Sequence, residues 1–255
     1  MEISIMGRNC RYEQEGQGRD VLLLHGWGGG VDSWIPIYNH LKTECRVTAI
    51  DFPGHGGSGQ PDESGWSVDE YTAFTAEFIE KTGLTGCDII AHSFGGRVAI
   101  KLAAEHPQLV GRLLLTGAAG LPPRRGAMYY VKTAVIKACK RLTYLLPGGA
   151  KLRERLGGRF GSADYRALPP AMRATFVKVV NQDLSQCLPL IQAETLLVWG
   201  RSDTATPLWM GQEMEKRIKG SALIVLEDAG HFAYLDKCDR FIRIMDAYLF
   251  PKKEA

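Results

Sequence analysis

The sequence lacks several features that would assign it to a special class of protein. No apolar stretch approaches the roughly 18 residues of a membrane-spanning helix, and the N-terminus lacks a basic segment followed by an apolar run. The six cysteines include no C-x-x-C pair and none at metal-ligand spacing from a histidine. Scattered cysteines are typical of free thiols in a reducing compartment, so we expect a cytoplasmic protein. They are Cys10, Cys45, Cys87, Cys139, Cys187 and Cys238.

Repeats, low-complexity tracts and nucleotide-binding loops are also missing. The glycine run at 28–30 does not have the G-x-G-x-x-G spacing of a dinucleotide site, so we expect neither a cofactor nor a metal. With 255 residues, 45 % hydrophobic and 23 % charged, the chain is long enough for one large α/β domain with an insertion.

The net charge of +3 conceals a strong segregation of charge along the chain. Residues 121–188 contain 13 Lys and Arg against three Asp and Glu, whereas the rest contains 18 against 25. A basic segment is therefore inserted in an otherwise acidic protein.

Buried strands are predicted at four apolar runs that alternate with helical patterns. This alternation favours a mostly parallel sheet, whose catalytic groups gather at the carboxyl ends of the strands. A hairpin is predicted over 2–13, and Ser67 with Glu70 forms a capping box that opens a helix to about Thr82. The runs lie at 21–24, 46–50, 112–116 and 195–199.

A further strand and helix surround Ser93. The apolar residues 89–91 predict a buried strand, and the apolar period over 97–105 predicts a helix. A serine on such a sharp turn presents its hydroxyl above the sheet edge, provided that the residues two before and two after it are small. Ala91 and Gly95 meet this requirement.

These residues resemble motifs of the α/β-hydrolase family. The sequence AHSFG at 91–95 is similar to the nucleophile elbow G-x-S-x-G, with Ala91 replacing the first glycine. HGWGGG at 25–30 resembles the oxyanion loop, and DFPGHGGSG at 51–59 resembles an architectural turn in which we interpret His55 as structural. The resemblance implies that Ser93 is the nucleophile and that the backbone N–H groups of Trp27 and Phe94 bind the oxyanion.

The remaining catalytic residues follow later in the chain. GRSDTATP at 200–207 resembles G-x-x-D-x-x-x-P, and Gly230-His231 matches the family's histidine loop. The resemblance implies that Asp203 orients His231, in the chain order Ser, Asp, His. Asp228 and Asp236 are alternative acids, interpreted as solvated loop charges. We expect an α/β-hydrolase fold, with a mostly parallel central sheet flanked by helices and a helical cap inserted between two late strands.

The expected cap covers residues 121–188 and divides the core into 1–120 and 189–255. Its predicted helices span 127–146, 151–156 and 170–182. The basic amphipathic segment 127–146 could alternatively contact a membrane surface through its tyrosines, although an apolar face over the active site explains the same pattern. The tyrosines are Tyr129, Tyr130 and Tyr144.

The first functional hypothesis is a serine hydrolase that cleaves a small carboxylic ester. A serine at the elbow disfavours the dehalogenase and epoxide hydrolase branches, which use a carboxylate nucleophile. The second is a lyase or carbon–carbon bond hydrolase acting on an anionic substrate. The position of Arg97, four residues after Ser93, resembles that of an arginine in the menaquinone-pathway lyase of this superfamily. Under this hypothesis Arg124 or Arg125 would help Arg97 to bind the anionic substrate.

A ligand-binding receptor built on a hydrolase fold is a third hypothesis, but such proteins usually have an eroded triad. We expect a small-molecule substrate and neither a nucleic-acid partner nor membrane contact. An anionic substrate fits both hypotheses, because under the first the basic cap either selects acyl groups with a negative charge or only keeps the protein soluble. Substrate identity, acyl length and oligomeric state do not follow from the sequence.

Overall fold

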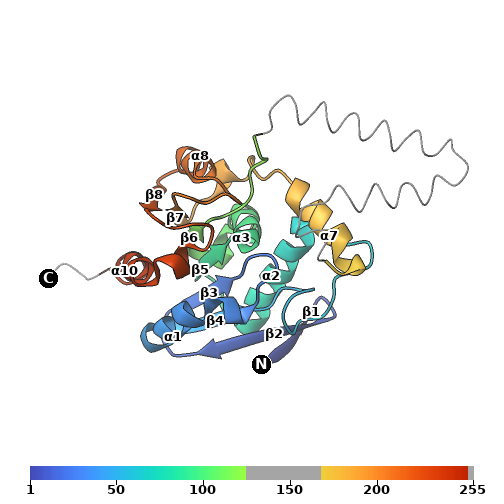
Figure 1. The fold of residues 1–255 in the computed structure, drawn as a ribbon. Helices are drawn as coiled ribbons and strands as arrows, with labels where there is room; N and C mark the ends of the chain where they lie inside the picture. Colours follow the sequence, from blue (N-terminus) through green and yellow to red (C-terminus); the bar gives the residue numbers. More distant parts are fainter. Residues whose placement is uncertain (125–167, 252–255) are drawn as a thin grey trace, which may run out of the picture.

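A single eight-stranded sheet forms the centre of the molecule in a computed structural model that describes residues 1–124 and 168–251 (Figure 1). The strand order is β1-β2-β4-β3-β5-β6-β7-β8. The strands from β4 to β8 are parallel, while β1 and β2 form an antiparallel hairpin at one edge. Their bounds are β1 Glu2–Ile5, β2 Arg8–Glu15, β3 Asp20–Leu24, β4 Arg46–Ile50, β5 Cys87–His92, β6 Val110–Thr116, β7 Glu194–Gly200 and β8 Ala222–Leu226.

Helices cover both faces of this sheet and enclose two apolar cores. One core includes buried residues of α2, α3 and α8, and the other includes those of α1, α9 and α10. Because both faces are covered, the inner parallel strands are almost continuously apolar. The bounds are α1 Ile35–Glu44, α2 Val68–Thr82, α3 Phe94–Glu105, α8 Trp209–Arg217, α9 Ala233–Asp236 and α10 Cys238–Leu249.

Local signals in the sequence predicted several of these elements. The N-terminal hairpin is present, and Ser67 forms the expected capping box at α2: Glu70 Oε2 accepts a hydrogen bond from Ser67 N at 2.6 Å, and Ser67 Oγ accepts one from Asp69 N at 3.1 Å. The helix after Ser93 begins at Phe94, three residues earlier than the apolar period indicated.

Helix α7 (Pro170–Asn181) lies within the predicted cap, of which residues 121–124 and 168–188 are described, and it contacts the loop before α2. Trp66 N donates to Thr175 Oγ1 at 3.0 Å, and Lys178 Nζ donates to the Gly65 carbonyl at 2.7 Å. Residues 125–167, with the predicted helices at 127–146 and 151–156 and their tyrosines, lie outside the described residues. No helix of the described part is long and apolar enough to span a membrane.

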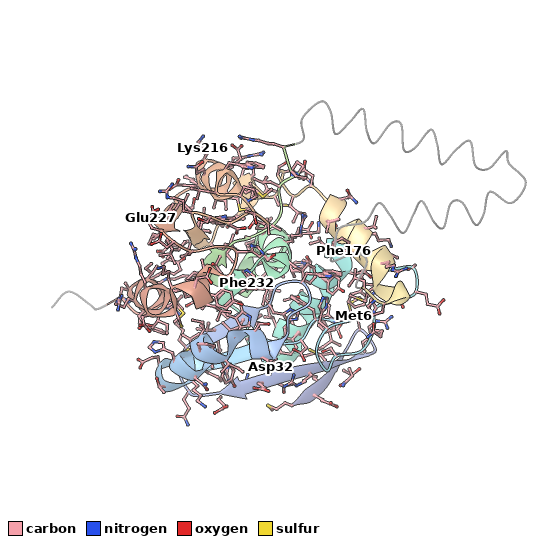
Figure 2. The ribbon with its side chains drawn as sticks, viewed as in Figure 1. Met6, Asp32, Phe176, Lys216, Glu227 and Phe232 are labelled. Carbon is pink, nitrogen blue, oxygen red and sulfur yellow. The ribbon has the colours of Figure 1, made fainter. Side chains whose placement is uncertain are left out.

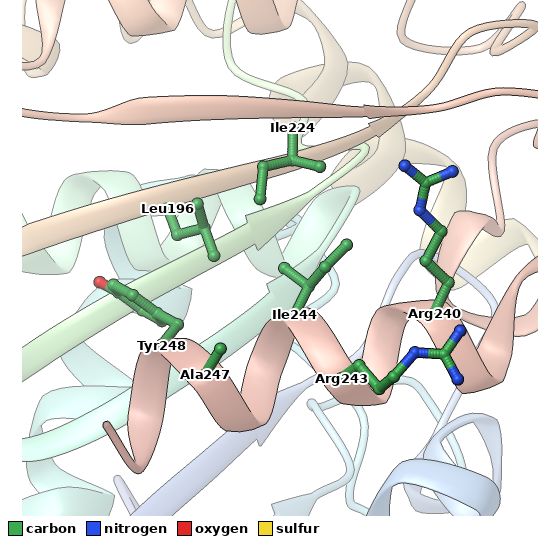
Figure 3. A pocket seen from close by; sticks show the side chains of 7 residues that line it. All are labelled: Leu196, Ile224, Arg240, Arg243, Ile244, Ala247 and Tyr248. Atoms are coloured by element: carbon green, nitrogen blue, oxygen red, sulfur yellow. The ribbon is translucent and has the colours of Figure 1, made fainter. Parts of the chain in front are cut away.

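A shallow groove lies between α10 and the last two strands (Figure 3). Apolar side chains of β7, β8 and α10 form most of its lining, and Arg240 and Arg243 lie at one end. It has no lining residue in common with the cavity beside Ser93. The five described cysteines are all free thiols.

Candidate active site

The parallel strands bring three loops together at their carboxyl ends. Ser93 follows β5, Asp203 follows β7, and His231 lies between β8 and α9. Residues far apart in the sequence therefore meet at one edge of the sheet, as expected for a parallel α/β architecture.

Ser93 adopts a strained backbone conformation, with φ of 50° and ψ of −108°. A positive φ is uncommon outside glycine and is often found at functional sites. The close approach of α3 to β3 explains the glycine at 95, because a Cβ there would lie 2.3 Å from the Leu24 carbonyl oxygen. Ala91 occupies the other position that must be small. It is fully buried, so an alanine fits there and no glycine is needed.

A line of hydrogen bonds connects Ser93 to a buried carboxylate. Ser93 Oγ lies 2.9 Å from His231 Nε2, and His231 Nδ1 lies 2.9 Å from Asp203 Oδ2. These distances allow Nδ1–H to donate to the carboxylate while Nε2 accepts from the serine hydroxyl. The structure thus brings together the three residues that the sequence predicted for the triad.

Several donors hold the carboxylate of Asp203. Its Oδ1 accepts from the backbone N–H groups of Ala205 at 2.9 Å and Thr206 at 2.8 Å, and Thr206 Oγ1 lies 2.7 Å from Oδ2. Burial alone would raise the pKa of Asp203, but the hydrogen bonds from His231 and Thr206 outweigh it and lower the pKa below its ordinary value. Asp203 is therefore ionised at neutral pH.

The alternative acids occupy other places. The Asp228 side chain is 89 % exposed and lies 3.9 Å from Lys237 Nζ. Asp236 Oδ2 accepts a hydrogen bond from Gly230 N at 2.7 Å, so it contacts the backbone of the histidine loop. Of the three acids, Asp203 is the one hydrogen-bonded to the His231 ring.

The two backbone donors predicted for the oxyanion hole lie in the loop after β3 and at the start of α3. The N–H groups of Trp27 and Phe94 find no acceptor among the described residues. The glycine before Trp27 lies against the elbow: a Cβ on Gly26 would lie 3.4 Å from Ser93 Cβ and 2.6 Å from His92 Nδ1. This placement is compatible with an oxyanion hole formed by Trp27 and Phe94.

A cavity of about 900 Å³ opens beside Ser93 and His231. Its lining includes Phe176 of α7 and Phe232 of the histidine loop, both labelled in Figure 2. The size is in the range of small-molecule sites. Its other apolar lining residues include Trp27, Leu121, Leu168, Val179, Val180, Met210 and Tyr234.

Arg97 also lines this cavity, and its side chain is buried. Its Nη1 donates to the Gln182 carbonyl at 2.8 Å and its Nη2 to the Val180 carbonyl at 3.4 Å, so it binds the carboxyl end of α7. Burial lowers the pKa of the guanidinium to about 10, although the charge of Asp183 acts to raise it. Arg97 therefore remains charged at neutral pH inside a largely apolar cavity.

The other predicted arginines are not assembled with Arg97 in the described structure. The Arg124 guanidinium stacks on the Trp209 ring at 4.3 Å from its centroid, and Arg124 is not among the residues that line the cavity. Arg125 lies outside the described residues.

Sequence reasoning missed three residues that contact the site. His92 Nε2 donates to the His231 carbonyl at 3.0 Å, Thr206 Oγ1 reaches the Gly117 carbonyl at 2.9 Å as well as Asp203, and His25 Nδ1 lies 2.7 Å from the Gly26 carbonyl. Each is adjacent to, or inside, a motif already recognised. Their polar character at buried positions was the available signal.

An elbow serine, a buried aspartate and a histidine at the carboxyl ends of β5, β7 and β8 of a parallel sheet define a protein of the α/β-hydrolase class. The comparison with family models agrees: the α/β hydrolase fold model matches residues 21–237. The chain belongs to this family and is a hydrolase of the α/β fold.

Its relatives include more than one type of hydrolase. The chain is 30 % identical over 237 residues to a pimeloyl-[acyl-carrier protein] methyl ester esterase of Neisseria meningitidis, covering 88 % of this chain and 74 % of the relative. It is 28 % identical over 252 residues to a 2-hydroxy-6-oxo-2,4-heptadienoate hydrolase of Pseudomonas putida, covering 92 % and 90 %. A solved esterase from Exiguobacterium antarcticum has a TM-score of 0.77 and 27 % identity, covering 97 % of this chain and 98 % of its own.

Proposed function

We propose that the protein is a serine hydrolase that cleaves a small carboxylic ester through an acyl-enzyme intermediate. The observation that carries this proposal is the hydrogen-bonded line from Ser93 through His231 to Asp203, at the wall of a cavity large enough for a small ester. The relatives that are named as esterases support the same class of substrate.

The geometry allows each residue a defined role. His231 Nε2 removes the hydroxyl proton as Ser93 Oγ attacks the ester carbonyl, and it returns that proton to the departing alcohol. Asp203 holds Nδ1–H of His231 and stabilises the imidazolium. The N–H groups of Trp27 and Phe94 bind the oxyanion. Water then attacks the acyl-enzyme, with His231 again as the base, and releases the carboxylic acid. We also propose that residues 121–188 form a cap that covers the cavity.

The first experiment measures hydrolysis of p-nitrophenyl esters from acetate to octanoate. We expect turnover by the wild type and its loss, by several orders of magnitude, in Ser93→Ala. The matched control is Ser202→Ala, which removes an exposed hydroxyl next to Asp203. If Ser93→Ala retains turnover, or if a serine-directed fluorophosphonate fails to label wild type, Ser93 is not the nucleophile.

Arg97 favours a second candidate, a lyase or carbon–carbon bond hydrolase acting on an anionic substrate. A buried guanidinium on the cavity wall is suited to bind a carboxylate, and the relative named for a dienoate supports this possibility. The opposing observation is that two of its nitrogen atoms already donate to carbonyls of the α7 end.

Paired substrates separate these two roles of Arg97. Its replacement by lysine keeps the charge and loses the planar fork. If Arg97 binds a substrate carboxylate, kcat/KM falls more for an acid-terminated acyl ester than for its methyl-terminated analogue. If Arg97 only anchors α7, both substrates are affected equally and the anionic proposal is wrong.

A further inference from the structure

Thr206 is a buried residue in the loop after β7, three positions after Asp203, and 4 % of it is exposed. Its backbone N–H donates to Asp203 Oδ1 at 2.8 Å. Its carbonyl accepts from the indole N–H of the fully buried Trp199 at 2.7 Å. Because the side chain is branched at Cβ, few rotamers are available to it. These contacts hold the hydroxyl group of Thr206 in a fixed place.

The hydroxyl of Thr206 lies among three polar atoms. Oγ1 is 2.7 Å from Asp203 Oδ2, 2.9 Å from the Gly117 carbonyl oxygen and 3.3 Å from His231 Nδ1. A hydroxyl has a single hydrogen, so it can donate to only one of the two oxygens at a time. A hydrogen bond to an ionised carboxylate is stronger than one to a neutral carbonyl. The charge of Asp203 and the shorter distance both favour Oδ2 as the acceptor.

Different groups hold the two oxygens of the Asp203 carboxylate. Oδ1 accepts from two backbone N–H groups of its own loop, those of Ala205 and Thr206. Oδ2 accepts from His231 Nδ1 at 2.9 Å and from the Thr206 hydroxyl. Within the described ranges 1–124 and 168–251, Thr206 is thus the only donor to Oδ2 besides the histidine that this oxygen orients.

The main chain after β6 packs directly against the same atoms. Gly117 has a positive φ of 50°, and a Cβ on it would lie 3.2 Å from Asp203 Oδ2 and 3.3 Å from His231 Nδ1. The hydroxyl therefore occupies a confined space between this main chain and the carboxylate. Valine has nearly the same shape as threonine, so it would fill that space and admit no water molecule in place of the hydroxyl.

We propose that Thr206 is a positioning residue that holds Asp203 Oδ2 toward His231 Nδ1 and shares the negative charge of that oxygen by donating its hydroxyl hydrogen to it. The inference rests on the proposed function, because it assigns a role beside the proposed triad. Thr206 borders the cavity, but its hydroxyl faces the carboxylate and the imidazole, so it acts through them.

A change in this charge should be visible in the pH dependence of turnover. Without the hydroxyl, the full charge of Oδ2 would attract the proton of an imidazolium more strongly, and the acid limb of kcat/KM would move to higher pH. In the described part of the chain, the other titratable ring against His231 is His92, at 4.7 Å between centroids. Burial lowers the pKa of His92 to about 3, so it stays neutral across this limb. The charge of Arg97, which lines the same cavity, is common to all variants.

Two substitutions at this position separate the hydroxyl from the methyl group. We expect Thr206→Val to lower kcat by about 10-fold, with a smaller change in KM, and to move the acid limb up by about half a pH unit. Thr206→Ser keeps the hydroxyl and should regain most of the lost activity and the original limb. Thr204→Val is the matched control, since it makes the same chemical change at an exposed position of the same loop.

A merely structural role of Thr206 would give a different pattern. If the methyl group alone matters for packing, Thr206→Ser loses as much activity as Thr206→Val or more, and neither variant moves the acid limb. Either result would overturn the proposal. Proton NMR of the Nδ1–H of His231 gives a second readout. Its resonance should shift in Thr206→Val, return in Thr206→Ser and stay unchanged in Thr204→Val.

The wild-type protein provides a test that does not depend on the variants folding. Neutron diffraction from crystals of the deuterated protein should locate the Thr206 deuteron between Oγ1 and Asp203 Oδ2. A deuteron directed at the Gly117 carbonyl would contradict the proposal even if Ser93 is the nucleophile. Failure of fluorophosphonate to label Ser93 would instead contradict the proposed function, so the two failures are distinguishable.

Discussion

At the scale of single residues, hydrogen-bond donors keep the carboxylate of Asp203 ionised, because burial alone would raise its pKa. The N–H groups of Ala205 and Thr206 and the His231 ring surround a carboxylate whose side chain has no exposed surface. Its proposed role is orientation: it would keep the proton of His231 on Nδ1, so that Nε2 is free to accept from Ser93.

The first residue-scale prediction is that Asp203→Asn lowers kcat by about 10⁴-fold. An amide presents an N–H or a weaker acceptor to Nδ1, so the histidine tautomer is no longer fixed. Asp228→Asn is the control, since that side chain is 89 % exposed and asparagine tolerates its positive φ of 54°. Ester turnover of both variants gives the comparison. Equal activities would exclude Asp203 as the orienting acid.

A second prediction concerns the last residue of the elbow, Gly95. We expect Gly95→Ala to cost about 3 kcal/mol, because the new methyl group meets backbone oxygens of β3 and His25 that cannot move aside. Gly83→Ala, at a left-handed position with open space around it, should cost only about 1 kcal/mol. Urea unfolding of both variants tests this order. A smaller loss at Gly95 would mean that α3 can move away from β3.

Sequence could predict the residues that we propose to react, but not all the residues that hold them in place. Ser93, Asp203 and His231 lie in recognisable local motifs. In contrast, Phe52, which donates to His25, and His231, whose carbonyl accepts from His92, lie 27 and 139 residues away from them in the sequence. The role of a buried histidine can be assigned only when the hydrogen-bond partners of its two ring nitrogens are known. Those partners depend on how the strands are arranged.

At the scale of elements, the start of α2 illustrates what short sequence patterns determine. The reciprocal bonds of Ser67 and Glu70 satisfy N–H groups that a helix end would otherwise leave free. Helix α10 carries a comparable signal in the apolar spacing of Phe241, Met245 and Leu249, which the sequence-based prediction did not include. The strand order, with β4 and β3 exchanged, depends on tertiary packing and has no local signal.

The element-scale prediction is a loss of about 1 kcal/mol of stability in Ser67→Ala. The denaturant midpoint should fall while the m-value stays constant, because the folded surface is unchanged. Glu70→Gln should lose less, since glutamine can replace glutamate in a capping box. A larger loss in the glutamine variant would show that the charge of Glu70, rather than the capping geometry, stabilises α2.

At the scale of the whole molecule, three buried histidines make the folded state sensitive to acid. Burial is the main cause in each case, and it lowers the pKa to about 4 for His25, about 3 for His55 and about 3 for His92. Their pKa in the unfolded chain is about 6.5. Between these values the unfolded state binds more protons, so the free energy of unfolding decreases as the pH falls.

We therefore predict that the contribution of these histidines to the free energy of unfolding is constant above pH 7 and declines below about pH 6.5. The slope should approach 1.4 kcal/mol per pH unit for each histidine, or about 4 kcal/mol per pH unit for the three. Urea unfolding between pH 7.5 and 5 measures it. His55→Gln removes one titrating ring and should reduce the slope by about one third. An unchanged slope would mean that His55 is protonated in the folded protein.

The sequence separation within the site has a consequence for refolding. Ser93 and His231 are 138 residues apart, and Asp203 reaches His231 only when β7 and β8 have joined the sheet. Contacts of such long range form late and slowly compared with local helices. During dilution from denaturant, helical circular dichroism should therefore return before ester turnover. The delay between the two signals would report how long the last strands take to pair.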